Sequence, residues 1–208
     1  MTIKTGLALH TSSPALGLAI GGGDDVRCQT WDLGRETSNY IHPYLQEFLH
    51  PHTWQDLAWI AVANGPGGFT GTRLGVVTAR TLAQQLDIPV FAISSLAAVA
   101  LSHEYTGSIA VSMPAGRGEV FGAVYQVDVD RLELTTILPD TVFTAADWDA
   151  KVVGFNPTHH QVVPQSANLS DTVTSVLSLA QIAYTQGQRP NWSSVLPYYG
   201  QHPVIDSK

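Results

Sequence analysis

A chain of 208 residues is long enough for one large domain or two small ones, and either size buries a sizeable hydrophobic core. Seventeen acidic residues against ten basic residues give a formal net charge of −7. Because binding of phosphate groups requires clustered Lys and Arg, this balance argues against a protein that grips nucleic acid unaided.

The first 31 residues predict a meander of three strands. Apolar runs at 3–10, 16–20 and 26–31 are separated by turn-forming residues. The sole cysteine, Cys28, lies in the third run, so no internal disulfide can form and a reducing compartment is expected. There is no secretory leader pattern and no apolar run long enough to span a bilayer, so we expect a cytoplasmic protein with no membrane partner.

The next segments predict a helix, a buried strand and a second helix. Residues 38–50 carry apolar side chains at the spacing of an amphipathic helix, namely Ile41, Tyr44, Leu45, Phe48 and Leu49. Residues 57–63 form a continuous apolar run, which is typical of a strand covered on both faces. A glycine-rich turn follows this strand and opens a helix that reaches about residue 86, with Thr70 as the expected N-cap.

The glycine-rich turn allows two interpretations. It can be a tight connection between a strand and a helix, because Gly permits close backbone approach and positive φ. It can also be an anion-binding nest at a helix N-terminus. The candidate residues for the nest are Gly65, Gly67, Gly68, Thr70 and Arg73.

The helix after the turn carries a row of small residues at four-residue spacing: Gly71, Gly75, Ala79 and Ala83. Such a row lets another helix approach closely. The opposite row is mostly apolar, so we expect the helix to be covered on two sides, one by its own sheet and one by a partner. The larger side chains of the preceding helix, Tyr44 and Phe48, complement the small row in size.

The second half of the chain predicts a smaller lobe. A strand at 89–93 leads to a helix capped by Ser94 or Ser95 that ends near residue 103. We place a lobe boundary near residue 105, so that 1–105 form the first lobe and 106–208 the second lobe with a C-terminal helix and tail. The expected elements of the second half are strands at 108–113, 120–127, 132–138 and 152–155, a polar loop holding His159 and His160, a helix at 171–186 and a tail at 190–208.

Residues 65–75 read Gly-Pro-Gly-Gly-Phe-Thr-Gly-Thr-Arg-Leu-Gly, which closely resembles the G-P-G-S-F-T-G-x-R-[IL]-G signature of the bacterial TsaB (YeaZ) family. The flanking segments 9–12, 88–96 and 119–121 also resemble that family, and the resemblance is specific from residue 3 to about 125. It implies an α/β fold of the actin-like (ASKHA, RNase H-like) type with two lobes, the second reduced.

The resemblance also implies a function. Members of this family act as non-catalytic subunits in forming threonylcarbamoyladenosine beside the anticodon of tRNAs that read codons starting with A. The expected partners are a TsaD-like catalytic subunit and a TsaE-like ATPase, with tRNA contacted only indirectly and a homodimer when the chain is isolated. The expected interface residues are Tyr44, Phe48, Gly71, Gly75, Ala79 and Ala83. A Gly75→Leu variant should then lose the partner and keep its fold.

The chain departs from the family pattern at two places. His10 stands where the family usually has Asp, and Pro114 and Gly116 lie where it has an Asp-Ala-Arg-like run. A neutral imidazole is a poor ligand for Mg²⁺, so the first departure weakens any case for Mg-ATP chemistry. We expect His10 to be a hydrogen-bonded residue at a strand end.

No catalytic residue, metal site or cofactor is predicted, because the chain lacks H-x-x-x-H, H-E-x-x-H and G-x-S-x-G spacings. The histidines at His50, His52, His159 and His160 are expected in loops. Two alternatives remain. The chain could be a nucleotide-binding enzyme with the Gly65 to Gly71 loop as its phosphate cradle, or a self-associating regulator that uses the same helices as a homodimer contact.

Overall fold

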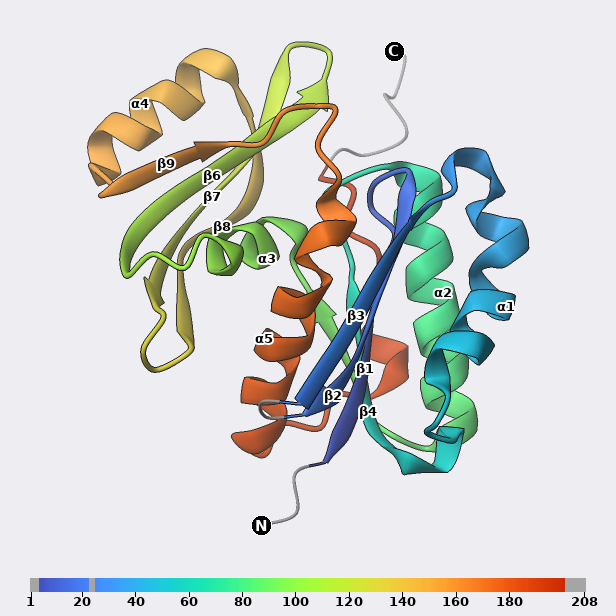
Figure 1. The fold of residues 1–208 in the computed structure, drawn as a ribbon. Coiled ribbons are helices and arrows are strands. Elements are labelled where there is room, and N and C mark those ends of the chain that lie inside the picture. Colours follow the sequence, from blue (N-terminus) through green and yellow to red (C-terminus); the bar gives the residue numbers. More distant parts are fainter. Residues whose placement is uncertain (1–3, 23–24, 201–208) are drawn as a thin grey trace.

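The computed structural model describes residues 4–22 and 25–200, and it contains two β-sheets with helices on both faces of each (Figure 1). The first sheet has the strand order β3-β2-β1-β4-β5, and the second has the order β8-β7-β6-β9. The strands of the two sheets are β1 (Thr5–His10), β2 (Ala15–Gly22), β3 (Asp25–Asp32), β4 (Leu57–Ala63), β5 (Val90–Ile93), β6 (Gly107–Gly116), β7 (Glu119–Asp128), β8 (Glu133–Thr144) and β9 (His159–Val162). The α-helices of the described chain are α1 (Thr37–Leu49), α2 (Phe69–Leu86), α3 (Ser95–Ser102), α4 (Ala145–Phe155) and α5 (Val173–Thr185).

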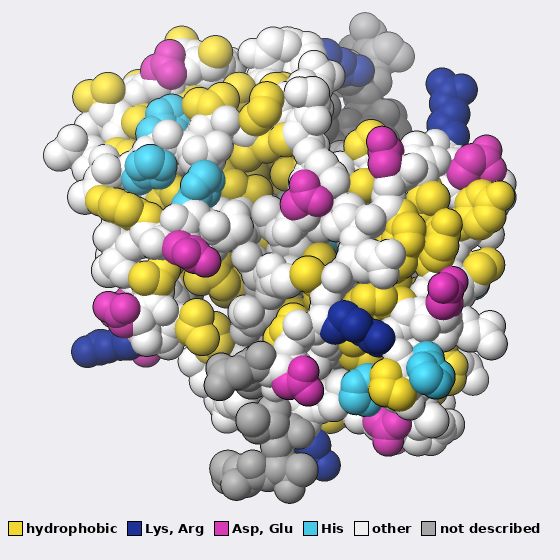
Figure 2. Space-filling model, viewed as in Figure 1, with side chains coloured by type: hydrophobic (Ala, Val, Ile, Leu, Met, Phe, Trp, Pro, Cys, Tyr) yellow, Lys and Arg dark blue, Asp and Glu magenta, His cyan; other side chains and the backbone are white. Residues whose placement is uncertain are grey.

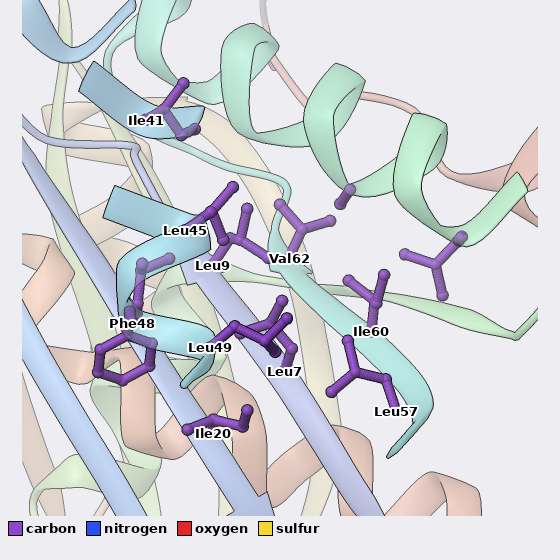
Figure 3. Close-up of a cluster of buried hydrophobic side chains, with 14 of the residues drawn as sticks. Leu7, Leu9, Ile20, Ile41, Leu45, Phe48, Leu49, Leu57, Ile60 and Val62 are labelled. Atoms are coloured by element: carbon purple, nitrogen blue, oxygen red, sulfur yellow. The ribbon is translucent and has the colours of Figure 1, made fainter. Parts of the chain in front are cut away.

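The first sheet is a mixed sheet whose two faces are covered by different helices. Strands β1, β2 and β3 form the predicted antiparallel meander, and β4 and β5 add in parallel to β1 through the crossover helices α1 and α2. Leu7 and Leu9 point toward α1 and α2, where the core shown in Figure 3 forms. Ala8 points to the opposite face, where it packs against α5. Because successive residues of a strand face opposite sides, β1 is buried on both faces.

The second sheet lies between α3 and α4. Leu96 and other residues of α3 pack on one face of the sheet, together with Phe121 and Tyr125. Trp148 of α4 packs on the opposite face, over Gly122, where a Cβ atom would lie 2.4 Å from the Trp148 ring. Helix α5 then returns to the first sheet, so the chain crosses between the two sheets more than once.

Several predicted elements are wrong or displaced. The predicted strand at 152–155 is the last turn of α4, and Asn156 caps the end of this helix in a left-handed conformation with φ 45°. The predicted loop containing His159 and His160 is the strand β9, which pairs in parallel with β6. Strand β8 continues to Thr144, well past the predicted end at residue 138. Each of these elements depends on a pairing or packing partner far away in the chain.

The end of the described chain is packed against the first sheet. The N–H of Tyr198 donates to the carbonyl oxygen of Asn64 at 2.7 Å, and the Asn64 side-chain amide donates to the carbonyl oxygen of Leu196 at 3.1 Å. The predicted tail beyond residue 200 lies outside the described residues. No helix in the described residues combines the length and apolar character needed to cross a membrane.

Candidate functional site

The glycine-rich turn between β4 and α2 packs directly on the turn between β1 and β2. The N–H of Gly68 donates to the carbonyl oxygen of Ser12 at 2.7 Å, and the Thr72 hydroxyl donates to the Ser12 hydroxyl at 3.1 Å. A Cβ atom at Gly67 would lie 2.4 Å from the Ser12 carbonyl oxygen, and one at Gly71 would lie 2.0 Å from the Thr11 carbonyl oxygen. Close packing within the chain therefore requires glycine at Gly67 and Gly71. This agrees with the first interpretation of the turn, a tight connection between a strand and a helix.

The start of α2 differs from the prediction by two residues. Gly68 is the N-cap and the helix begins at Phe69, so Thr70 is not the cap. Gly68, Thr70 and Arg73 are exposed, Gly67 is half-buried and Gly65 is buried with φ 109°. Since the Gly68 amide is already bonded to Ser12, it is not free for an anion, and the proposed nest stays a prediction.

A cleft of about 1070 Å³ opens between the two sheets beside this turn. Its walls come from the β1–β2 turn, the start of α1, the glycine-rich turn and the β6–β7 hairpin, which includes Pro114. The charged side chains that line it are Arg35 from the first-sheet side and Arg117 from the second, and no Asp or Glu of the described chain lines it. This charge pattern favours an anionic or neutral ligand over a cation.

His10 ends β1 directly before the residues that line the cleft. It is fully buried, and its Nδ1 accepts a hydrogen bond from the Ser12 N–H at 3.4 Å. Its Nε2 has no hydrogen-bond partner in the described residues. Burial lowers the pKa of His10 to about 3, so the imidazole is neutral at physiological pH.

The residues of the cleft do not fit a Mg²⁺ ion of the kind that accompanies bound nucleotide. Mg²⁺ takes carboxylate and other oxygen ligands. The described lining supplies no carboxylate, and His10 presents a neutral nitrogen that is sealed in the core. Within residues 4–22 and 25–200, no group of three or more His, Cys, Asp or Glu side chains could hold a metal ion.

The row of small residues on α2 faces the chain's own sheet. Gly75, Ala79 and Ala83 are buried, and a Cβ atom at Gly75 would lie 2.3 Å from the Thr11 hydroxyl and 3.5 Å from Val62. This corrects the expectation that the row offers its face to a partner helix. The small residues let α2 lie close to β1 and β4 instead.

The two larger residues of the predicted interface lie on α1. Tyr44 is half-buried and stacks on Trp31, with ring centroids 4.8 Å apart. Phe48 is 5% exposed, and Arg27 lies over its ring at 4.6 Å from the centroid. Phe48 is therefore covered by its own chain, and Tyr44 is the partly exposed residue of the two.

Three exposed apolar side chains of α1 and α2 were not among the interface residues predicted from the sequence. Tyr40 is 46% exposed, Phe69 is 53% exposed and Val77 is 52% exposed. Figure 2 shows hydrophobic side chains gathered on the α1 side of the molecule, near the right edge of the view. Arg73 and Val77 are four residues apart and face away from the small row, so helical spacing alone could have identified this outer face. Phe69, one turn earlier, stacks on Tyr199 with ring centroids 4.4 Å apart and lines the cleft.

The sequence and the fold are similar to those of known proteins. The family model described as "TsaD: tRNA N6-adenosine threonylcarbamoyltransferase" matches residues 33–187. The tRNA threonylcarbamoyladenosine biosynthesis protein TsaB of Bacillus subtilis is 38% identical over 147 residues, which cover 68% of this chain and 63% of that protein. TsaB of Escherichia coli is 31% identical over 127 residues, which cover 59% of this chain and 55% of that protein. The matches thus span about three fifths of the length of these curated relatives.

A solved structure, YeaZ from Pseudomonas aeruginosa, superimposes with a TM-score of 0.77 at 24% identity and covers 94% of this chain and 100% of that chain. A second Pseudomonas aeruginosa structure, an uncharacterized protein with similarity to peptidase YEAZ, has a TM-score of 0.78 at 23% identity, covering 96% of this chain and 100% of that chain. At these identities the likeness shows the fold alone. It confirms the predicted actin-like, RNase H-like α/β fold.

Proposed function

The chain belongs to the TsaD family, on its TsaB (YeaZ) branch, and we propose that it serves tRNA threonylcarbamoyladenosine biosynthesis as a non-catalytic subunit that dimerises with a TsaD-like catalytic subunit. The observation that carries this proposal is the exposed apolar surface of α1 and α2. Two large apolar side chains there, Tyr40 of α1 and Val77 of α2, are each about half exposed. Exposed apolar and aromatic groups of this kind are typical of protein–protein contacts.

The cleft supports the non-catalytic part of the proposal. Its described lining carries two arginines and no carboxylate, and the buried His10 is neutral. A general base needs a titratable group within reach of the substrate, with a pKa near the working pH. Neither arginine meets that requirement, because a guanidinium does not give up its proton in proteins.

The remaining partners are those that the family resemblance implies. A TsaE-like ATPase would join the assembled complex, and the α1 and α2 surface would mediate a homodimer when the chain is isolated. A net charge of −7 disfavours direct contact with tRNA, so tRNA would be held by the assembly as a whole. The site of action would be the cytoplasm.

The direct test is co-purification with the TsaD-like subunit of the same organism, followed by light scattering to measure the mass of the complex. We expect a one-to-one heterodimer that forms in preference to the homodimer of the isolated chain. If the two proteins elute separately at micromolar concentration, the subunit proposal fails. An assay of tRNA modification by the mixed proteins does not replace this measurement, because such an assay does not measure the contact between the two subunits.

The alternative is a nucleotide-binding enzyme, and the cleft of about 1070 Å³ with its two arginines is the observation that favours it. Titration calorimetry with ATP, in the presence of Mg²⁺ and again in the presence of EDTA, separates the two proposals. The subunit proposal expects no tight binding of Mg-ATP to the isolated chain. Micromolar binding that requires Mg²⁺ would favour the enzyme and contradict the poor fit of the cleft to a metal ion.

A further inference from the structure

A second pocket, of about 620 Å³, lies between the two sheets and shares no lining residue with the cleft. Asn64 after β4 and Ser94 before α3 form one side of it, and Tyr125 and Asp140 of the second sheet form another. Tyr198 of the C-terminal segment closes the set. The volume is within the range of about 300–1000 Å³ that is typical of small-molecule sites.

The polar centre of the second pocket is the carboxylate of Asp140. The Tyr125 hydroxyl donates to its Oδ1 at 2.6 Å, and the Tyr125 and Ser94 hydroxyl oxygens lie 3.3 Å apart. The Tyr198 hydroxyl donates to the backbone carbonyl oxygen of Asp140 at 2.7 Å. Three hydroxyl groups from different parts of the chain therefore surround this residue and hold it in place.

Within residues 4–22 and 25–200, no Lys, Arg or His forms an ion pair with Asp140. The one ion pair of the described chain joins Arg131 to Asp128, at the far end of the second sheet's hairpin. Removing a carboxylate from water without a cationic partner is costly, and hydrogen bonds from neutral hydroxyls offset only part of that cost. The N-terminus of α3, which Ser94 caps, adds a partial positive charge nearby.

Burial also raises the pKa of Asp140 above its usual range, so these neutral donors do not fully stabilise the carboxylate. A ligand with a positive charge would gain from a carboxylate that is half-buried and already oriented by hydrogen bonds. The pocket walls around this carboxylate are largely aliphatic and would accept an apolar body: Ala92, Ile93, Ala97, Leu134, Pro139 and Leu179.

We propose that the second pocket binds a compact organic cation, an alkylammonium or alkylguanidinium group on a small apolar body, with Asp140 as its anionic partner. The side-chain amides of Asn64 and Gln188 and the hydroxyl of Thr136, which also line the pocket, supply further hydrogen bonds. A divalent metal ion does not fit, because one carboxylate is too few ligands for it. This site is independent of the TsaD-like partner and is testable on the isolated chain.

The test uses a pair of probes with the same shape and different charge, n-butylguanidinium and the neutral n-butylurea, followed by two-dimensional NMR of the amide groups. We expect the cation to shift the amide signals of pocket residues such as Ala97 and Thr136. Its affinity should exceed that of the urea by about tenfold, the factor that one charge-assisted hydrogen bond supplies. N-acetylarginine methylamide, a capped arginine, tests whether the pocket also binds the guanidinium group of an arginine side chain in a polypeptide.

Two variants decide whether Asp140 is the cation's partner. Asp140→Asn keeps the side-chain volume. It should reduce the affinity for n-butylguanidinium about tenfold and leave the affinity for n-butylurea unchanged. Tyr125→Phe removes the donor and keeps the charge, so it should bind the cation at least as tightly as the wild type. The matched control is Asp128→Asn, which changes a carboxylate outside the pocket and should leave both affinities unchanged.

The proposal is overturned if the wild type binds neither probe, if it binds both equally, or if Asp140→Asn binds the cation as the wild type does. Signal shifts confined to residues outside the pocket would overturn it as well. If Asp140→Asn does not fold, Tyr125→Phe still decides the question. Cation binding at least as tight as that of the wild type in this variant supports the proposal, and loss of binding contradicts it.

Discussion

Gly75 of α2 lies directly against Thr11: a Cβ atom added to Gly75 would lie 2.3 Å from the Thr11 hydroxyl oxygen. The same hydroxyl donates to the carbonyl oxygen of Gly71 at 2.8 Å, so the first turn of α2 and the end of β1 are joined by contact and by a hydrogen bond. Because there is no room for a side chain, the distance between helix and sheet depends on glycine at these positions. The small-residue row of α2 is therefore a requirement of the chain's own packing.

This contact predicts the effect of adding a methyl group. Gly71→Ala and Gly75→Ala should each lower the free energy of unfolding by about 1–3 kcal/mol, the usual cost of overpacking. The matched control is Gly154→Ala in α4, where a Cβ atom meets no other atom within 4 Å. That change should leave stability unchanged or raise it by up to about 1 kcal/mol, because Ala favours helix. Urea unfolding measures all three, and equal effects in α2 and α4 would contradict the packing account.

The expectation for Gly75→Leu changes accordingly. A leucine is larger still, so this substitution should destabilise the chain itself, and a lost partner would then say nothing about the interface. The substitution therefore cannot serve as a test of partner binding that leaves the fold intact.

The outer face of α2 provides the sharper test of partner binding. Val77→Glu places a charge at a side chain that is 52% exposed, so the fold should be kept, while affinity for the TsaD-like subunit should fall by about tenfold or more. The control is Val153→Glu on α4, where the valine is 80% exposed and the helix packs on the second sheet. Surface plasmon resonance with the immobilised partner gives both affinities. If Val153→Glu weakens binding and Val77→Glu does not, the interface lies on the α4 side of the second sheet.

His10 predicts a dependence of stability on pH. Its pKa falls from 6.5 in the unfolded chain to about 3 in the folded chain, so below pH 6.5 the unfolded state binds a proton that the folded state excludes. The stability that the neutral His10 contributes is thus fully present above pH 6.5, and it is lost as the pH falls toward 3. From about pH 6.5 to about pH 5 the free energy of unfolding should fall by about 2 kcal/mol from this residue.

The variant His10→Asn checks this assignment. The asparagine carries no titrating group, and its oxygen can replace Nδ1 as the acceptor of the Ser12 N–H, so the loss of stability between about pH 6.5 and about pH 5 should shrink by about 2 kcal/mol. His160→Asn, which changes an exposed histidine of β9, is the control and should keep the wild-type pH dependence. Unfolding by urea at several pH values measures both, and an unchanged slope in His10→Asn would contradict a neutral buried imidazole.

The N-terminus of α4 gives a further prediction. The Thr144 hydroxyl accepts a hydrogen bond from the Asp147 N–H at 3.1 Å and donates to the Asp147 carboxylate at 2.8 Å. Thr144→Ala should therefore lower the free energy of unfolding by about 1 kcal/mol, as expected for the loss of a helix N-cap. Thr144→Ser, which keeps the capping hydroxyl, is the control. A loss of equal size in Thr144→Ser would mean that the hydroxyl contributes nothing of its own.

Local patterns alone predicted much of the first sheet and of the helices next to it. The continuous apolar run at 57–63 is β4, and the amphipathic spacing at 38–50 is α1, displaced by one residue at each end. Ser94 caps α3 as expected, with its hydroxyl accepting from the N–H groups of Leu96 and Ala97. These features are determined by short-range physics, namely periodicity, burial and capping, which a single sequence displays directly.

Other features depend on contacts between residues that are distant in the chain. Helical spacing showed that Gly75, Ala79 and Ala83 share a face of α2, but only the position of α2 on β1 and β4 decided that this face is covered by the chain's own sheet. His159 and His160 form a strand because β6 offers a free edge for pairing. The carboxylate of Asp140 became a candidate binding site only when the fold placed it beside Tyr125 and Ser94. The sequence determined β4, α1 and the cap of α3, because those choices are local, whereas tertiary packing decided where α4 and β9 form, how far β8 extends, which faces are covered and which polar groups meet.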